Sequence, residues 1–312
     1  MMHYNVIQWL FFFYLYCFLG WCFESAYVSI KSRKPVNRGF MRGPFLPLYG
    51  SGATMMLVVS SPFQDNLLLT YMAGVVGATA LEYITGVTME ALFKVRYWDY
   101  SNQRFNYKGH ICLSSSIAWG FLTILMTRVI HRPIEQFVLS IPALVLFGVT
   151  FVLTLYLVVD FTLSFKAAME LRDILVKMQK LKEEVERLQR RLDVIIAFNN
   201  AEKEQKRLES ELSLAELSQG VKQRFASLKE NIQNMPSAYG EGIREEIAEL
   251  RGRFSHYVDV QKGYREMLGF YKRAMIRNNP TMVSGKFRNT LEELKRIVSG
   301  EQREEEDQET PG

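Results

Sequence analysis

Four carboxylates interrupt long apolar stretches of this sequence: Glu24, Glu82, Glu90 and Asp160. An ionisable side chain within a membrane span is costly, so each one is first treated as a functional candidate. Counting about 20 residues from the outer end of each stretch puts Glu24, Glu90 and Asp160 near the inner membrane boundary, where an interfacial carboxylate explains them. Glu82 lies a turn or more deeper, so we expect it to have a buried partner or to contact water.

Basic residues gather at the same end of these stretches. The candidate polar cluster consists of Glu24, Arg38, Arg42, Glu82, Glu90, Arg96 and Asp99. It suits a polar vestibule that opens inward, and it suits equally a structural ion-pair network that ties the loops to the helices. Glu82 and Glu90 are eight residues apart, about 80° around a helix, so they could share a broad face but not one coordination point.

Residues 38–52 are rich in glycine and proline where they meet the membrane. Non-helical backbone at that depth requires a protein cover or water, so the segment predicts either a broken helix that lines a cavity or a tight cytoplasmic turn. Residues 96–107 hold five aromatic side chains, which are typical of an interfacial aromatic belt and less so of a gating or docking loop.

The sequence lacks the phosphate loop G-x-x-x-x-G-K-[ST] and the hydrolase motifs H-E-x-x-H and G-x-S-x-G. Its four histidines are isolated, and its three cysteines lie in apolar surroundings. We therefore expect no enzymatic activity, no catalytic residues, no cofactor and no metal site. Acids match the basic residues of the second half, which argues against a nucleic-acid partner.

Composition divides sharply near residue 166. Residues 1–165 contain 11 of the 38 lysines and arginines and 7 of the 33 acids, whereas residues 166–312 contain the other 27 and 26. A mostly uncharged half followed by a densely charged half excludes a single soluble globular domain.

Five apolar stretches of residues 1–165 are predicted to span a membrane: 6–30, 45–61, 67–93, 111–130 and 137–165. The stretch 45–61 is short and could instead be a re-entrant loop. Lysines and arginines number nine in the loops after the first and third stretches, against two on the other side. The positive-inside rule then predicts a multi-pass plasma-membrane protein with its N-terminus outside and its tail in the cytoplasm. The fold class is therefore all-α, a five-helix transmembrane bundle followed by a cytoplasmic helical or coiled-coil domain.

The tail begins with a heptad pattern. Apolar residues from Leu171 to Ile195 are spaced 3-4-3-4, a strong coiled-coil signal. We predict coiled-coil helices over 166–233, a helical segment over 243–298 and a disordered acidic end over 299–312, with a break at Pro236. The heptads fit an antiparallel hairpin within the chain and a homodimer equally well.

Several motifs of residues 5–165 resemble a bacterial membrane family named "Putative ABC-transporter type IV". They are Gly20-Trp-Cys-Phe-Glu24, the segment 38–52, Glu82-Tyr-Ile-Thr-Gly86, Trp98-Asp-Tyr-Ser101 and Gly109-His-Ile-Cys-Leu113. The resemblance implies a transport permease that works with a separate ATPase subunit, and it implies no catalytic residues. A five-span unit is small for a permease, so the resemblance also implies at least a dimer.

The sequence is compatible with three functions. The first is a permease subunit of unknown substrate, and the second is a membrane-anchored scaffold that recruits cytoplasmic partners through its tail. The weakest is an intramembrane enzyme with Glu24 and Glu82 as paired carboxylates.

Overall fold

The computed structural model describes residues 4–197, 218–226, 245, 248–260, 263 and 268–299. They divide into two compact units, each described by itself below. Unit 1 contains Met1–Glu170 and Tyr271–Val283, and unit 2 contains Leu171–Phe270 and Ser284–Gly312. The predicted break at Pro236 and the predicted acidic end after Ser299 lie outside the described residues.

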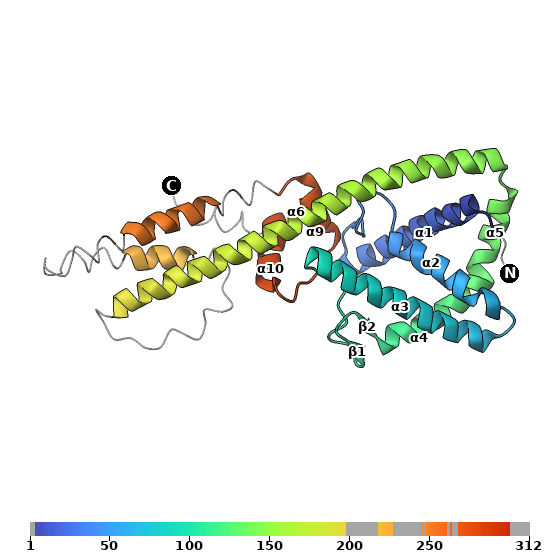
Figure 1. The fold of residues 1–312 in the computed structure, drawn as a ribbon, viewed down its shortest axis with the longest axis horizontal. Coiled ribbons are helices and arrows are strands. Elements are labelled where there is room, and N and C mark those ends of the chain that lie inside the picture. The colour runs from blue at the N-terminus through green and yellow to red at the C-terminus, as the bar shows by residue number, and fades with distance from the viewer. Residues whose placement is uncertain are drawn as a thin grey trace. The chain divides into compact units, whose positions relative to one another are not determined.

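The described structure is almost entirely helical, as predicted, with one small antiparallel pair formed by β1 (Asn106–Tyr107) and β2 (Ile111–Cys112) (Figure 1). Four helices are long and apolar enough to cross a membrane. They are α1 (Val6–Ser32), α3 (Leu67–Phe93), the continuous helix Leu113–Ser140 and α6 (Ala143–Ala197). Large apolar side chains cover much of their outer surface, as expected of helices that contact lipid. The protein is therefore a membrane protein.

The predicted second span is a shorter helix. Helix α2 (Pro47–Ser60) has 14 residues, and the single turn η1 (Ser61–Phe63) follows it. At about 1.5 Å per residue α2 is roughly 21 Å long, less than the hydrocarbon core of about 30 Å. Residues 33–46 before it are not helical. The predicted second span is thus corrected to a short helix beside four helices long enough to span, and a five-helix bundle stays a prediction.

The predicted boundary between the last two spans is also corrected. Helix α4 (Leu113–Leu125), the π-helical turn η2 (Met126–Ile130) and α5 (His131–Ser140) run without a break to the turn at Pro142. The sequence prediction placed a turn between the stretches 111–130 and 137–165. The π turn directly before α5 adjusts the backbone locally, so the helix passes through Pro133.

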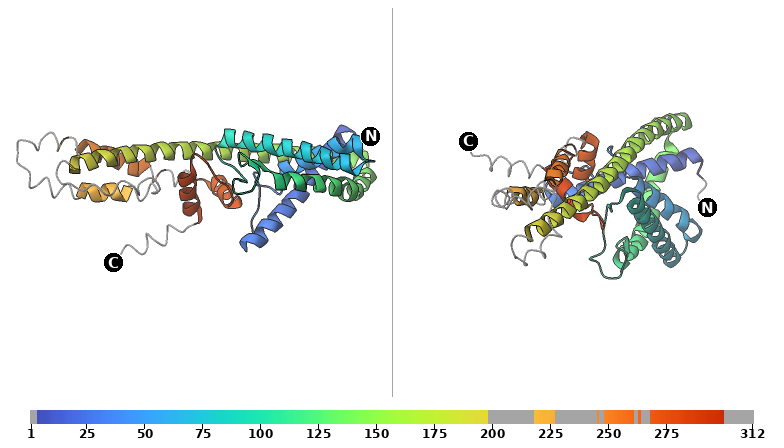
Figure 2. Two further views of the ribbon diagram at one scale, coloured as in Figure 1. Left: turned by 90° about the horizontal axis from the view of Figure 1, so that it is seen from below. Right: turned by 60° about the vertical axis from the view of Figure 1, so that its left-hand side comes forward.

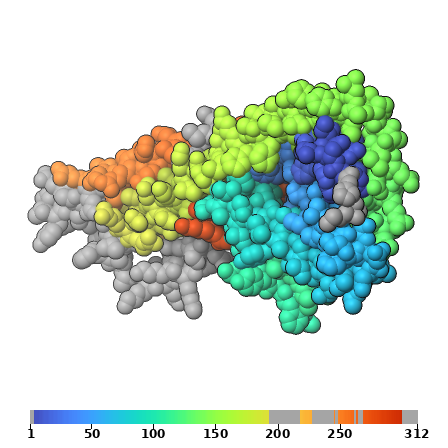
Figure 3. Space-filling model, turned by 45° about the vertical axis from the view of Figure 1, so that its right-hand side comes forward, coloured from blue at the N-terminus to red at the C-terminus, as the bar shows by residue number. Residues whose placement is uncertain are grey.

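Helix directions alternate along unit 1. Gly20 faces Tyr49 and Gly50 faces Cys17, so α2 runs antiparallel to α1. Helices α3 and α4 are antiparallel too, since Gly74 contacts Thr123 and Thr79 bonds to Ser116. Helix α6 is parallel to α1, because Leu146 packs with Phe12 and Thr154 with Tyr14. Figure 2 gives two further views of these helices, and Figure 3 shows α2 and α3 side by side on one face.

In unit 2, intrachain contacts cover the heptad seam. Leu181, Val185, Leu188 and Leu192 pack against side chains of the helical residues 218–226 and 248–260. Helix α10 (Arg288–Ser299) contacts α6 through Thr290, which bonds to Gln179. This arrangement favours a hairpin within the chain, and a dimer through the same seam stays a prediction.

The return segment, Tyr271–Val283, belongs to unit 1 although the sequence suggested a tail helix there. It contains most of α9 (Phe270–Asn278) and the turn after it. Val283 exchanges both backbone hydrogen bonds with Arg96, at 2.7 and 2.9 Å. Chain far beyond the last apolar helix therefore completes the membrane unit.

Candidate functional site

Arg38 is a buried cation within the non-helical segment 33–46. Its guanidinium lies 3.5 Å from Glu24 and donates to Asn279, to Thr281 and to the carbonyl of Tyr97, at 2.9–3.1 Å. The side chain of Asn279 also donates to the carbonyl of Gly39. The return segment thus supplies two of the groups that keep this buried charge hydrogen-bonded.

Glu24 and Tyr49 join α1 to the start of α2. The Tyr49 hydroxyl donates to Glu24 at 2.5 Å, and the side chain of Tyr49 packs where Gly20 leaves space. Leu46, the residue before α2, donates its backbone N–H to the carbonyl of Cys17 in α1. No side chain caps the start of α2, and its first turn reaches the Glu24 carboxylate through the Tyr49 hydroxyl.

Glu82, on α3, accepts three hydrogen bonds from α4 and the loop before it. The donors are the Tyr100 hydroxyl at 2.9 Å, the Trp119 indole at 3.0 Å and the Ser115 hydroxyl at 3.3 Å. The side chain is only 6% exposed. The prediction that depth would require partners for Glu82 therefore agrees with its surroundings.

Tyr100 donates its hydroxyl to Glu82. Burial, and then the negative charges of Glu82 and Glu24, raise the pKa of its hydroxyl, which stays a hydrogen-bond donor. We call Glu24, Arg38, Tyr49, Glu82 and Tyr100 the carboxylate cluster. Its two carboxylates, Glu24 and Glu82, accept hydrogen bonds from different tyrosines.

Glu90, Arg96, Asp99 and His110 form a second group, which we call the loop cluster. Arg96 pairs with Glu90 at 2.9 Å and lies 3.6 Å from Asp99, while the His110 ring lies 3.1 Å from Glu90. Burial, and then the charge of Arg96, lower the pKa of His110. The neutral form of His110 is therefore favoured beside Glu90, and these contacts fix the loop that carries Tyr100.

Arg42 and Asp160 lie in neither cluster. The Asp160 carboxylate accepts the backbone N–H of Gly43 at 2.8 Å, and the Arg42 guanidinium lies 4.7 Å from the centre of the Tyr271 ring. The seven predicted residues of one polar cluster are thus distributed over three places.

One buried polar group was missed by the sequence analysis. The His131 ring lies between the hydroxyls of Tyr16, at 2.6 Å, and Tyr4, at 3.0 Å, and Tyr4 also donates to Glu135. His131 and Glu135 are four residues apart, which places them on one helix face. That spacing was a usable signal within a segment that the sequence predicted to be a turn between two spans.

Within the described ranges, no group of three or more histidine, cysteine or acidic side chains could hold a metal ion. The cysteines are free thiols. The described site can therefore provide fixed negative charge, hydroxyl and indole donors, and a helix N-terminus.

Comparison with known proteins gives one match. Residues 11–165 match the family model described as "Putative ABC-transporter type IV", which confirms the resemblance over that segment. Neither the curated proteins nor the solved structures contain a match to the chain.

Proposed function

We propose that residues 11–165, as a member of the ABC-transporter type IV family, form the permease part of a transporter, with the carboxylate cluster as its substrate or coupling site. The ATPase would be a separate subunit, because the chain has no phosphate loop. The proposal assigns Glu82 the role of a fixed buried charge. The Arg38–Glu24 pair would link the site at Glu82 to the cytoplasmic loops.

The short helix α2 is the observation that carries this proposal. Its uncapped N-terminus begins beside the middle of α1, where Leu46 bonds to Cys17, and its first turn contacts Glu24 through Tyr49. Discontinuous helices whose N-termini point at polar groups near the membrane midplane are the usual binding elements of transporters. Cys17 is 11 residues from Val6, about 17 Å along α1, which corresponds to the midplane of a core of about 30 Å.

Membrane topology supports access from the cytoplasm. The parallel course of α1 and α6 agrees with an odd number of crossings, in which residues 33–46 and α2 together make the second. The positive-inside rule then orients the N-terminus outward and the loops with Arg38 and Arg96 inward, in the plasma membrane. The carboxylate cluster would be reached from the cytoplasmic side.

Uptake measurements test the proposal. A strain without the gene is screened with a panel of radiolabelled solutes, and any solute that depends on the chain is measured in Glu82→Gln and Arg38→Ala variants. We expect uptake to fall at least about tenfold in both, because each loses a buried charge-assisted contact. Glu292→Gln, on the exposed surface of α10, is the control and should behave as wild type. No dependent solute, or unchanged uptake in both variants, would contradict a permease.

The return segment favours a second candidate, a scaffold whose tail acts on the membrane unit. Asn279 and Thr281 link the distal chain to Arg38. A chain truncated after Lys166 would lose this link and every tail helix, whereas one truncated after Ser299 would lose only the acidic end. Full function after the first truncation would exclude the scaffold role.

A further inference from the structure

A cleft of about 280 Å³ lies outside both clusters, between the loop at Arg42 and Gly43, one face of α6, and Tyr271 of α9. All residues that line it belong to unit 1. The permease proposal assigns no role to this cleft.

One wall of the cleft carries opposite charges. The Arg42 guanidinium lies over the Tyr271 ring, and the Asp160 carboxylate is 8% exposed and accepts the N–H of Gly43. Tyr156 adds a hydroxyl, which would lie only 2.1 Å from a Cβ atom placed on Gly43. The glycine thus permits the close approach of the loop to α6. A cation, a carboxylate and a hydroxyl line a single small space.

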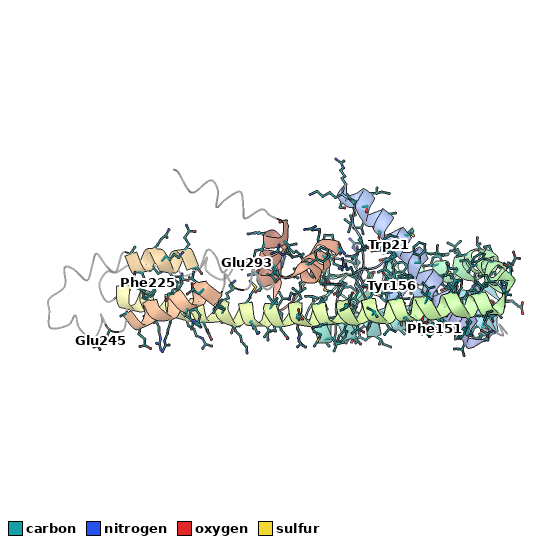
Figure 4. All side chains as sticks on the ribbon, turned by 90° about the horizontal axis from the view of Figure 1, so that it is seen from above. Trp21, Phe151, Tyr156, Phe225, Glu245 and Glu293 are labelled. Atoms are coloured by element: carbon teal, nitrogen blue, oxygen red, sulfur yellow. The ribbon has the colours of Figure 1, made fainter. Side chains whose placement is uncertain are left out.

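The rest of the lining, from α6, is apolar and open. Val159 and Leu163 are 59% and 41% exposed, and the exposed apolar surface of α6 continues from them to Leu155, Val152 and Phe151. Figure 4 labels Phe151 and Tyr156 on this helix. In a membrane protein, a continuous apolar helix face of this kind contacts acyl chains.

The position of the cleft along α6 fits a lipid headgroup. Asp160 is 17 residues after Ala143, about 26 Å along the helix, close to the thickness of the hydrocarbon core of about 30 Å. The polar wall therefore lies at the level where phosphates meet acyl chains. This placement rests on the membrane orientation given under the proposed function.

We infer that the cleft binds phosphatidylethanolamine, with its phosphate at Arg42, its ammonium group at Asp160, and its acyl chains along Val159 and Leu163. Arginine suits a phosphate, and an ammonium group suits a carboxylate. Phosphatidylglycerol has no cation for Asp160. Phosphatidylcholine has no N–H group that could donate to the Asp160 carboxylate.

Lipid titration of the purified, delipidated full chain tests this inference. Native mass spectrometry measures the binding of phosphatidylethanolamine, phosphatidylglycerol and phosphatidylcholine to wild type and to Asp160→Asn. Asparagine keeps an acceptor for the N–H of Gly43 but removes the charge. We expect wild type to bind one phosphatidylethanolamine about tenfold more tightly than the other two lipids, and Asp160→Asn to lose that preference.

Two further variants serve as controls. Asp173→Asn removes an exposed carboxylate of α6 and should keep the preference. Arg42→Gln should weaken all three lipids, since each carries a phosphate. Equal binding of the three lipids to wild type, tighter binding of phosphatidylglycerol, or an unchanged preference in Asp160→Asn would overturn the inference. Lipid binding is measured without transport, so its failure is distinguishable from failure of the permease proposal.

Discussion

Glu82 is the residue on which the carboxylate cluster depends. Its carboxylate is buried, and it is stable there only because three donors from other elements reach it. The sequence could predict the need for partners, because depth along α3 follows from counting residues. It could not predict that Tyr100 and Trp119 are the partners, since residues 18 and 37 positions away have no local spacing signal.

Trp119→Phe tests this hydrogen-bonded carboxylate. The ring is kept while Glu82 loses its indole donor, so we expect a loss of about 1–3 kcal/mol in stability. The measurement is the thermal unfolding midpoint of the purified protein in detergent. Trp9→Phe is the matched control, because the Trp9 indole makes no hydrogen bond with any residue that the structure describes. Equal midpoints for the two variants would contradict the role of the Trp119 bond.

His110 makes the loop cluster sensitive to acid. Its neutral form is favoured in the folded state by burial and by Arg96, against the opposing charges of Glu90 and Asp99. A lowered folded pKa means that its contribution to stability is complete above its ordinary pKa of 6.5 and is lost as the pH falls through the folded value. We therefore expect the unfolding midpoint to drop more between pH 7.5 and 5.5 in wild type than in His110→Asn. An equal drop would show that another group causes the acid sensitivity.

Helix α2 is held against α1 by glycines. A Cβ atom on Gly50 would lie 2.4 Å from the Cys17 sulfur and 2.7 Å from the carbonyl oxygen of Phe13, whereas a Cβ on Gly52 would meet no described atom within 4 Å. We expect Gly50→Ala to destabilise the protein by about 1–3 kcal/mol through overpacking. Gly52→Ala should be neutral or slightly stabilising, because alanine favours helix. Thermal unfolding of both variants distinguishes them, and similar midpoints would contradict the close packing of α2 on α1.

The return segment is held by Asn279, which is 1% exposed. Its amide group bonds to Arg38, to the Gly39 carbonyl and to the Met275 carbonyl. Asn279→Ala should destabilise the protein by at least about 1–3 kcal/mol, because it leaves the Arg38 donor and two carbonyls without this partner. Asn278→Ala, its half-buried neighbour, should cost much less. If both variants unfold at the same temperature, the segment is not anchored in this way.

The elements themselves were predictable to different degrees. The bounds of α3 follow directly from its apolar run, residues 67–93. The bounds of α4 and α5 could not be predicted in this way. The π turn that lets the helix continue through Pro133 has no recognisable sequence signal. Pro44, Pro47 and Gly50 indicated that the second stretch would be short or broken, and α2 has 14 residues.

For the whole molecule, the division near residue 166 was predictable because charge composition changes there. The assignment of Tyr271–Val283 to the membrane unit was not, since it rests on contacts between residues more than 180 positions apart, such as Val283 with Arg96. The tail that follows the family-matched residues 11–165 therefore also supplies part of the membrane unit.

Cysteine accessibility tests the central claim, a carboxylate cluster open to the cytoplasm, most directly. Ser115→Cys is placed beside Glu82 in a chain whose three native cysteines are replaced, and a charged, membrane-impermeant thiol reagent is applied to inside-out and right-side-out vesicles. Leu57→Cys, within the apolar core of unit 1, is the control and should remain unmodified in both. We predict modification of Ser115→Cys in inside-out vesicles only. No modification in either preparation, or modification from the outer face, would contradict the account.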